Sequence, residues 1–190
     1  EDGDDQHKQD HRAAADREGL DIDFHVAFAE STGLPTGSFD VVTASQCFIY
    51  FDKAAVIPEL KRLLAADGRL VTCHFCWLPR EDALARASEE LVLKYNPDWS
   101  AADWAGVIPA SPAWAGTDFE VVKQIVFDAD VPFTRESWRG RIRACRGAGA
   151  ALSADELSRF DHEHAELLGR MSPPQFTVRH RIDAHILRPL

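Results

Sequence analysis

Strand and helix patterns alternate through the first 77 residues, and this alternation constrains the fold more than any other feature of the chain. Residues 39–44 are β-branched and mostly apolar, as in a strand that is covered on both faces. Asp52 is placed to cap a following helix, and the pair Asp67 and Gly68 ends that helix. A second strand is predicted over residues 69–77. Short connections between such elements favour a doubly wound, mostly parallel α/β sheet.

The N-terminal part of the chain is strongly acidic. Residues 1–30 hold ten acidic and three basic residues, so they carry −7 of the net charge of −10. Residues 4–17 predict a solvated helix that ends near Gly19, and the alternation over residues 22–28 predicts a strand. Because broad nucleic-acid binding needs a positive surface, the acidic balance argues against a nucleic-acid partner.

Composition places the chain among ordinary globular proteins. It has 190 residues, of which 45% are hydrophobic, and no apolar run approaches the roughly 18 residues of a membrane span. Four cysteines in a chain of this size do not indicate a disulfide framework, and no secretory signal is recognisable, so we expect a cytoplasmic protein. Cys73 and Cys76 have metal-site spacing but would point to opposite faces of a strand, so no metal is expected.

The second half of the chain changes character. From Leu84 to Tyr95 the apolar residues recur at helical spacing, which predicts a helix. An irregular Trp- and Pro-rich stretch follows over residues 96–116. Residues 119–127 predict a strand, and a capping box at Ser153 and Glu156 opens a long helix. The clean alternation over residues 176–187 suits an antiparallel strand at or near a sheet edge.

Several short motifs together resemble the class I S-adenosylmethionine-dependent methyltransferases, specifically the small-molecule type 11 group. They are FAESTGLP at residues 28–35, SFDVV at 38–42, TASQ at 43–46, ELKRLL at 59–64 and DGRL at 67–70. The resemblance covers about residues 2–77 well and the C-terminal strand more loosely. It implies a Rossmann-like fold with an antiparallel last strand and a helical, Trp-rich cap insert. It also implies methyl transfer from S-adenosylmethionine to a small-molecule acceptor.

The resemblance assigns cofactor contacts to the N-terminal half. Asp2 precedes Gly19 by seventeen residues, as the ribose-binding acid of the family does, although it is alternatively one more exposed acid. Phe28 stands where many relatives carry an acid that binds adenine, so it can only pack against that ring or belong to the core. Glu30 and the backbone of Ala29 are assigned to the same site.

Two further cofactor contacts are expected where the strand over residues 39–44 ends. Ser45 and Gln46 follow that strand, and ligands of such sheets bind at the carboxyl ends of the strands. The Gln46 amide either holds the methionine end of the cofactor, positions the substrate, or is a polar loop group.

The Gly-rich cofactor loop of the family is missing from the sequence. By the family's register, the first strand, the Gly loop, the first helix and most of the second strand are absent. The chain therefore resembles a single, incomplete methyltransferase domain over residues 1–190. The expected parts are cofactor-side βα units at 1–77, cap and substrate elements at 78–118 and 128–175, and C-terminal strands at 119–127 and 176–187. A non-catalytic fragment, or a pseudo-methyltransferase acting as an interaction subunit, is the alternative.

Candidates for substrate binding and catalysis lie in the second half. Trp99 and Trp104 either close over an apolar acceptor or form a core for their own loop. Arg139 and Arg143 share a helix face, where they either clamp an anionic substrate, balance the acidic N-terminal helix, or are solvated. His164, on an apolar helix face, is either a general base or a hydrogen-bonded core histidine. No other catalytic residue is assigned, because alignment dominates methyl transfer.

Overall fold

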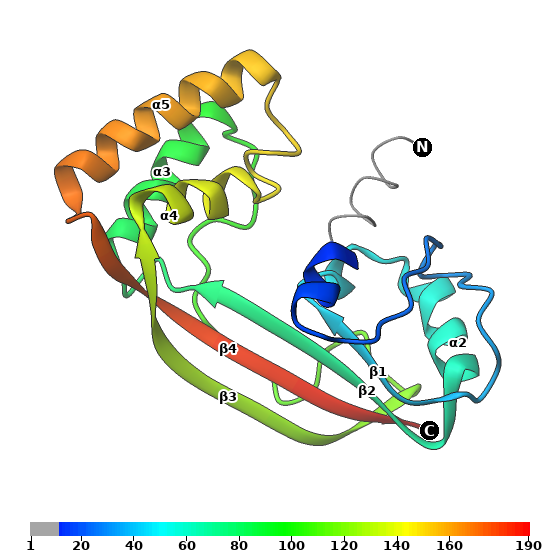
Figure 1. Ribbon diagram of the computed structural model, residues 1–190. Coiled ribbons are helices and arrows are strands. Elements are labelled where there is room, and N and C mark those ends of the chain that lie inside the picture. Colours follow the sequence, from blue (N-terminus) through cyan, green and yellow to red (C-terminus); the bar gives the residue numbers. More distant parts are fainter. Residues whose placement is uncertain (1–11) are drawn as a thin grey trace.

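The computed structural model describes residues 12–190, and Figure 1 shows its arrangement. Its elements are, in chain order, β1 (Phe39–Ser45), the 3-10 turn η1 (Phe48–Tyr50), α2 (Lys53–Leu63), β2 (Leu64–Trp77), α3 (Ala83–Tyr95), β3 (Phe119–Thr134), α4 (Arg135–Arg143), α5 (Ala154–Met171) and β4 (Gln175–Pro189). Residues 12–17 are helical, and Gly19 follows with a φ of 66°, as predicted for the end of a helix.

The four strands form one open sheet in the order β1-β2-β4-β3. β1 pairs with β2 in parallel, whereas β4 is antiparallel to both β2 and β3. The α/β class and the antiparallel last strand are therefore confirmed. Within the described residues the sheet is mixed rather than mostly parallel, because β4 runs antiparallel to both of its neighbours. β4 lies second from the edge, and β3 is the edge strand.

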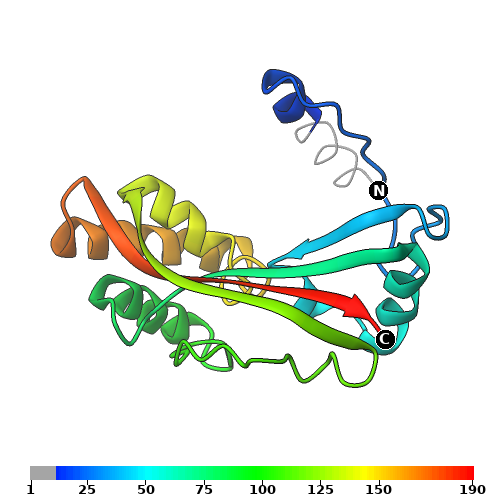
Figure 2. The same cartoon turned by 90° about the horizontal axis from the view of Figure 1, so that it is seen from below.

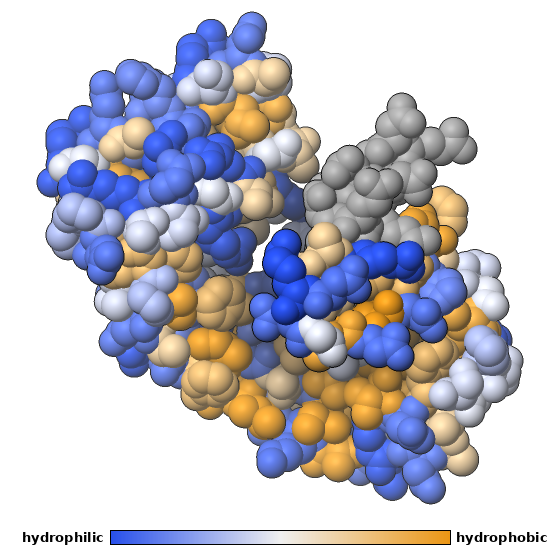
Figure 3. Space-filling view, viewed as in Figure 1, coloured by the Kyte–Doolittle hydropathy of each residue, from blue (hydrophilic) through white to orange (hydrophobic). Residues whose placement is uncertain are grey.

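β3 continues beyond its predicted end at Phe127. Residues 128–134, expected in the cap, instead complete the ladder with residues 175–181 of β4. β3 also carries exposed apolar side chains at Val122, Val126 and Phe127. Figure 3 shows apolar surface over this part of the sheet. The boundary between sheet and cap in this part of the chain therefore lies at Thr134.

The strand predicted over residues 22–28 does not form. Ile22, Val26 and Phe28 are 47%, 60% and 81% exposed, and the strand pairing seen there among residues 12–190 is an isolated bridge between Phe28 and Ser31. Figure 2 shows this part of the chain projecting away from the sheet. Alternation alone does not make a strand, since a strand also needs a neighbour that takes up its hydrogen bonds.

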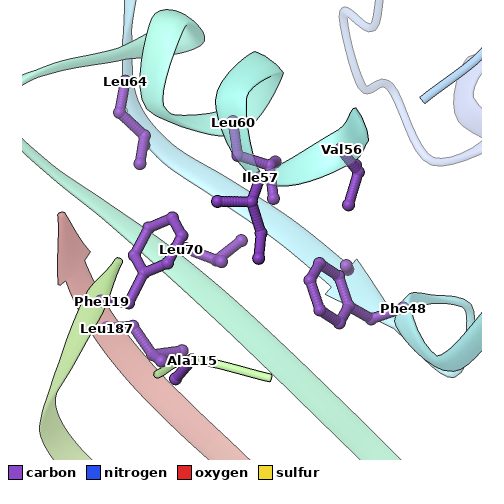
Figure 4. Close-up of a cluster of buried hydrophobic side chains, with 10 residues drawn as sticks. Phe48, Val56, Ile57, Leu60, Leu64, Leu70, Ala115, Phe119 and Leu187 are labelled. Atoms are coloured by element: carbon purple, nitrogen blue, oxygen red, sulfur yellow. The ribbon is translucent and has the colours of Figure 1, made fainter. Parts of the chain in front are cut away.

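Two apolar cores lie at opposite ends of the sheet (Figure 1). At one end, α2 packs Val56, Ile57 and Leu60 over the sheet, where they join Leu70 and Phe119 (Figure 4). The helix begins at its Asp52 cap, whose side chain accepts a hydrogen bond from the Ala54 backbone at 2.9 Å, and Pro58, the alternative start expected from the sequence, lies inside the helix.

At the other end, α3, α4 and α5 gather around the fully buried Trp138. The predicted capping box at Ser153 and Glu156 is present at the start of α5. None of the described helices has the length and apolarity needed to cross a membrane. The sheet thus joins two packed ends, and the segment between α3 and β3 runs along one side of it.

Candidate functional site

A cavity of about 370 Å³ lies between the sheet and the segment that joins α3 to β3. Its walls include His74, Cys76 and Trp77 from β2, Asp183 and His185 from β4, and Trp99, Trp104, Val107, Ile108 and Trp114 from the connecting segment. Most of these side chains are apolar or aromatic. The cavity opens beside the carboxyl end of β2, the end at which α/β sheets bind ligands.

One wall of the cavity carries two histidines and a buried carboxylate. His74 and Asp183 are cross-strand partners, and His185 follows two residues later on the same face of β4. His74 Nδ1 lies 3.1 Å from Asp183 Oδ2, and His185 Nδ1 lies 3.6 Å from the same oxygen. Asp183 and His185 are each only 2% exposed. Within the described chain, Asp183 Oδ1 and His185 Nδ1 are buried without a hydrogen-bond partner.

A second buried carboxylate fixes the Trp-rich segment over the cavity. Glu89 of α3 is 4% exposed and accepts hydrogen bonds from Trp77 Nε1 at 2.6 Å and from the Asp103 backbone at 2.7 Å. Burial raises the pKa of the Glu89 carboxyl, and the two donors oppose that rise. Glu89 thereby ties α3, β2 and the connecting segment to one another. At the same end, the Arg141 guanidinium lies 4.9 Å from the centre of the Trp77 ring.

The predicted cofactor residues of the 28–30 segment lie beside the chain that follows β1. Ala29 packs against the core cluster that contains Phe48, and Glu30 Oε1 accepts a hydrogen bond from the Asp52 backbone at 3.2 Å. The Phe28 ring is largely exposed. Asp2, the predicted ribose ligand, lies outside the described residues.

Ser45 and Gln46 lie at the carboxyl end of β1, as predicted. Ser45 is exposed, whereas Gln46 takes a left-handed conformation with a φ of 62°. The Gln46 backbone donates to Cys73 O at 2.9 Å, and its side-chain amide donates to Phe75 O. The Gln46 amide is therefore engaged with β2, next to the cavity-lining Cys76.

The structure brings together only part of the predicted substrate set. Trp99 and Trp104 both line the cavity. Arg139 and Arg143 do not, because both guanidiniums form ion pairs with Asp161 of α5 and with Glu136. Their place in the fold corresponds to charge balancing rather than to an anion clamp, although the acids they balance belong to α4 and α5.

His164 is also absent from the cavity wall. It has no exposed surface, and its Nε2 lies 3.0 Å from Ser88 Oγ inside the helical core. Burial lowers the pKa of His164 to about 4. This placement matches the core histidine rather than the general base.

Sequence reasoning missed the polar residues of the cavity wall, namely His74, Asp183 and Glu89. His74 and Asp183 lie on strands that were predicted. Because side chains alternate between the two faces of a strand, the sequence alone indicates which neighbours in the same strand share a face with each residue. Only the pairing register between the strands, which is not a local property, brings the two side chains together.

Part of the sequence, and the fold as a whole, are similar to known methyltransferases. Residues 2–72 match a family model described as a methyltransferase domain. Among solved structures, a putative type II methyltransferase from Anaeromyxobacter dehalogenans aligns with 87% of this chain and 70% of its own, with 20% identity and a TM-score of 0.51. A search of curated proteins gave no match.

Two other solved structures align with lower scores. A putative methyltransferase from Bacillus halodurans covers 88% of this chain and 77% of its own, with 15% identity and a TM-score of 0.46. The YcgJ protein from Bacillus subtilis aligns with 92% of this chain and 75% of its own, with 20% identity and a TM-score of 0.42.

The fold is similar to the Rossmann-like fold of a solved methyltransferase structure. The family match over residues 2–72 agrees with the resemblance that the sequence motifs indicated over residues 2–77.

Proposed function

We propose that the chain transfers a methyl group from S-adenosylmethionine to a small, largely apolar acceptor bound in the Trp-lined cavity. The observation that carries this proposal is the position of the cavity. It adjoins the carboxyl end of β2, and Ile49, four residues beyond β1, forms part of its wall. The predicted cofactor residues therefore lie along the chain next to the cavity that would hold the acceptor.

The groups at the carboxyl end of β1 suit an adenosyl ligand. Phe28 offers an exposed aromatic face for stacking, Glu30 offers a carboxylate that can accept hydrogen bonds, and Ser45 offers an exposed hydroxyl. When bound, S-adenosylmethionine supplies the electrophilic methyl group. The protein's own contribution would be to orient the two reactants and exclude water.

The cavity suits a ring-containing acceptor. Its volume of about 370 Å³ falls in the lower part of the range for small-molecule sites. Trp99 and Trp104 give it flat aromatic walls that favour stacking on a planar ligand. Arg141, Glu89 and Asp183 are its charged groups, so polar recognition is confined to a few points on an otherwise apolar surface.

Calorimetry with two probes tests both halves of the site. S-adenosylhomocysteine titrated into the chain should bind, and Phe28→Ala should weaken this binding. Indole, titrated next, should bind in the cavity. Trp104→Ala should lower the affinity for indole without changing the affinity for S-adenosylhomocysteine. His162→Gln is the matched control, because His162 is exposed on α5, where its side chain is 79% accessible. Absence of S-adenosylhomocysteine binding would overturn the proposal.

A second candidate function is an interaction subunit without catalysis. The outer edge of β1 pairs with no described strand, and Val41 on that strand is 52% exposed. An open edge of this kind can accept a strand from another chain. This candidate predicts no heat with S-adenosylhomocysteine, so the same titration separates it from the enzyme.

A further inference from the structure

The His74–Asp183 pair is the only hydrogen-bonded histidine–carboxylate pair on the cavity wall within the described residues. The His74 side chain is 27% exposed and Asp183 is 1% exposed, with 3.1 Å between His74 Nδ1 and Asp183 Oδ2. The carboxylate is thus buried and the imidazole is partly exposed, and both residues line the cavity. In this arrangement the His74 imidazole corresponds to a general base, and the Asp183 carboxylate corresponds to the acidic group that orients it.

The hydrogen bond fixes which ring nitrogen carries the proton. A carboxylate without its proton only accepts hydrogen bonds, so in that state of Asp183 the Nδ1 atom of His74 is the donor. In a neutral ring, Nε2 then keeps its lone pair. Among the described residues, no protein group hydrogen-bonds to Nε2 of His74. That nitrogen is available to a ligand in the cavity.

The surroundings compensate the charge that a proton on His74 would create. An imidazolium at this position would lie directly against the buried Asp183 carboxylate. The other titratable or charged side chains that share the cavity wall are Cys76, Glu89, Arg141 and His185. Of these, Arg141 carries a positive charge and Glu89 a carboxyl group, and Asp183 is the carboxylate in direct contact with His74.

His185 cannot take this role. Its Nε2 lies 2.9 Å from Pro109 O and 3.1 Å from Gln124 Nε2, and its Nδ1 is buried toward Asp183. Both of its ring nitrogens are therefore occupied by protein groups or sealed from the cavity. His185 instead helps to hold the connecting segment and Asp183 in place.

We propose that His74 is the general base of the reaction, that Asp183 is its positioning residue, and that the acceptor is methylated at an O–H or N–H group. This inference rests on the proposed function. The acceptor lone pair forms a bond to the methyl carbon, and the carbon–sulfur bond breaks with its electron pair passing to sulfur. The acceptor proton moves to His74 Nε2 and leaves later to solvent through the exposed part of the ring.

The first test reads the proton position without any substrate. Long-range proton–nitrogen correlation spectra of the labelled chain at mildly alkaline pH should show His74 with Nδ1 protonated and Nε2 unprotonated. The signals are assigned with His74→Gln, and Asp183→Asn should shift His74 away from this tautomer. A wild-type His74 with its proton on Nε2, or with both nitrogens protonated, would overturn the inference. The wild-type spectrum alone decides this point if Asp183→Asn fails to fold.

The second test compares two probe acceptors that differ in their need for a base. Phenol must lose its proton during the reaction, whereas thiophenol is largely ionised beforehand. With tritiated S-adenosylmethionine, His74→Gln should lower phenol methylation about 100-fold or more and thiophenol methylation by less than about threefold. His162→Gln should leave both rates unchanged. If His74→Gln lowered the methylation rates of both probes equally, His74 would have a structural role only, and the base role would be overturned.

The two proposals fail in different ways. If the chain binds no S-adenosylhomocysteine and methylates neither probe, the proposed function is wrong, while the spectra still report the state of the His74–Asp183 pair. If the chain methylates thiophenol but not phenol, the proposed function stands and the base assignment is wrong.

Discussion

His164 gives the sharpest prediction about stability, because its protonation state follows from its neighbours. Ser88 Oγ donates its proton to Leu84 O at 2.8 Å and accepts a hydrogen bond from Trp138 Nε1 at 3.0 Å. His164 Nε2, 3.0 Å from the same oxygen, must therefore be the protonated nitrogen. Nδ1 is then an unprotonated atom, buried without a partner in the described chain.

Protonation of Nδ1 would place an unpaired positive charge inside the helical core. Burial accordingly lowers the pKa of His164 from 6.5 to about 4. Between these two pH values the unfolded chain binds a proton that the folded chain does not, so stability falls as the pH drops. At about 1.4 kcal/mol for each pH unit, the loss over the whole window is on the order of 3 kcal/mol.

Urea unfolding at pH 7 and at pH 4.5 measures this loss. His164→Gln removes the titrating group, while its amide can still donate to Ser88 Oγ. Between the two pH values, wild-type protein should lose about 2 kcal/mol more stability than His164→Gln does. His162→Gln serves as the control, since its exposed ring should leave the wild-type pH dependence in place.

Parallel pH dependence of wild-type and His164→Gln would refute the reasoning. It would mean that water or a rearranged core accommodates the charged ring. A difference of the opposite sign would be equally decisive, because it would require a partner that favours the imidazolium.

Two other changes have predictable effects. Gly147→Ala would put a Cβ 2.6 Å from the Trp99 ring, so the ring should be displaced and indole binding in the cavity should weaken several-fold by calorimetry. Asp161→Ala removes the shared partner of Arg139 and Arg143, which should lower the free energy of unfolding by about 1–2 kcal/mol in urea. S-adenosylhomocysteine binding should be unchanged by Asp161→Ala, and a loss of binding would show that the two arginines serve the site.

The strands of the first half could be predicted because their signals are local. Residues 39–44 and 69–77 combine β-branched apolar residues with flanking turns, and both are confirmed within β1 and β2. β2 begins earlier than predicted, at Leu64, because it pairs there with Phe39. The segment over residues 22–28 shows the limit of this reasoning, since no strand of the described part of the chain lies beside it to complete its alternating pattern.

The site was predictable only where a single side chain carries the signal. Trp99 and Trp104 stand out in an irregular segment, and both line the cavity. His74 and Asp183 carry no such signal, because each is a polar residue in an alternating strand. A slip of one residue in the β2–β4 pairing would turn Asp183 to the opposite face, so the pair exists only through the register.

The turn after β1 connects the two halves of the proposed site. The left-handed backbone of Gln46 redirects the chain directly after Ser45, and its side-chain amide binds the Phe75 carbonyl of β2. Cys76, the next residue of β2, and Ile49, three residues beyond Gln46, both line the cavity. The carboxyl end of β1, where the cofactor is proposed to bind, and the cavity proposed for the acceptor therefore share one hydrogen-bonded junction. A shared junction of this kind fixes the distance between two bound reactants, which is the main requirement for an in-line methyl transfer.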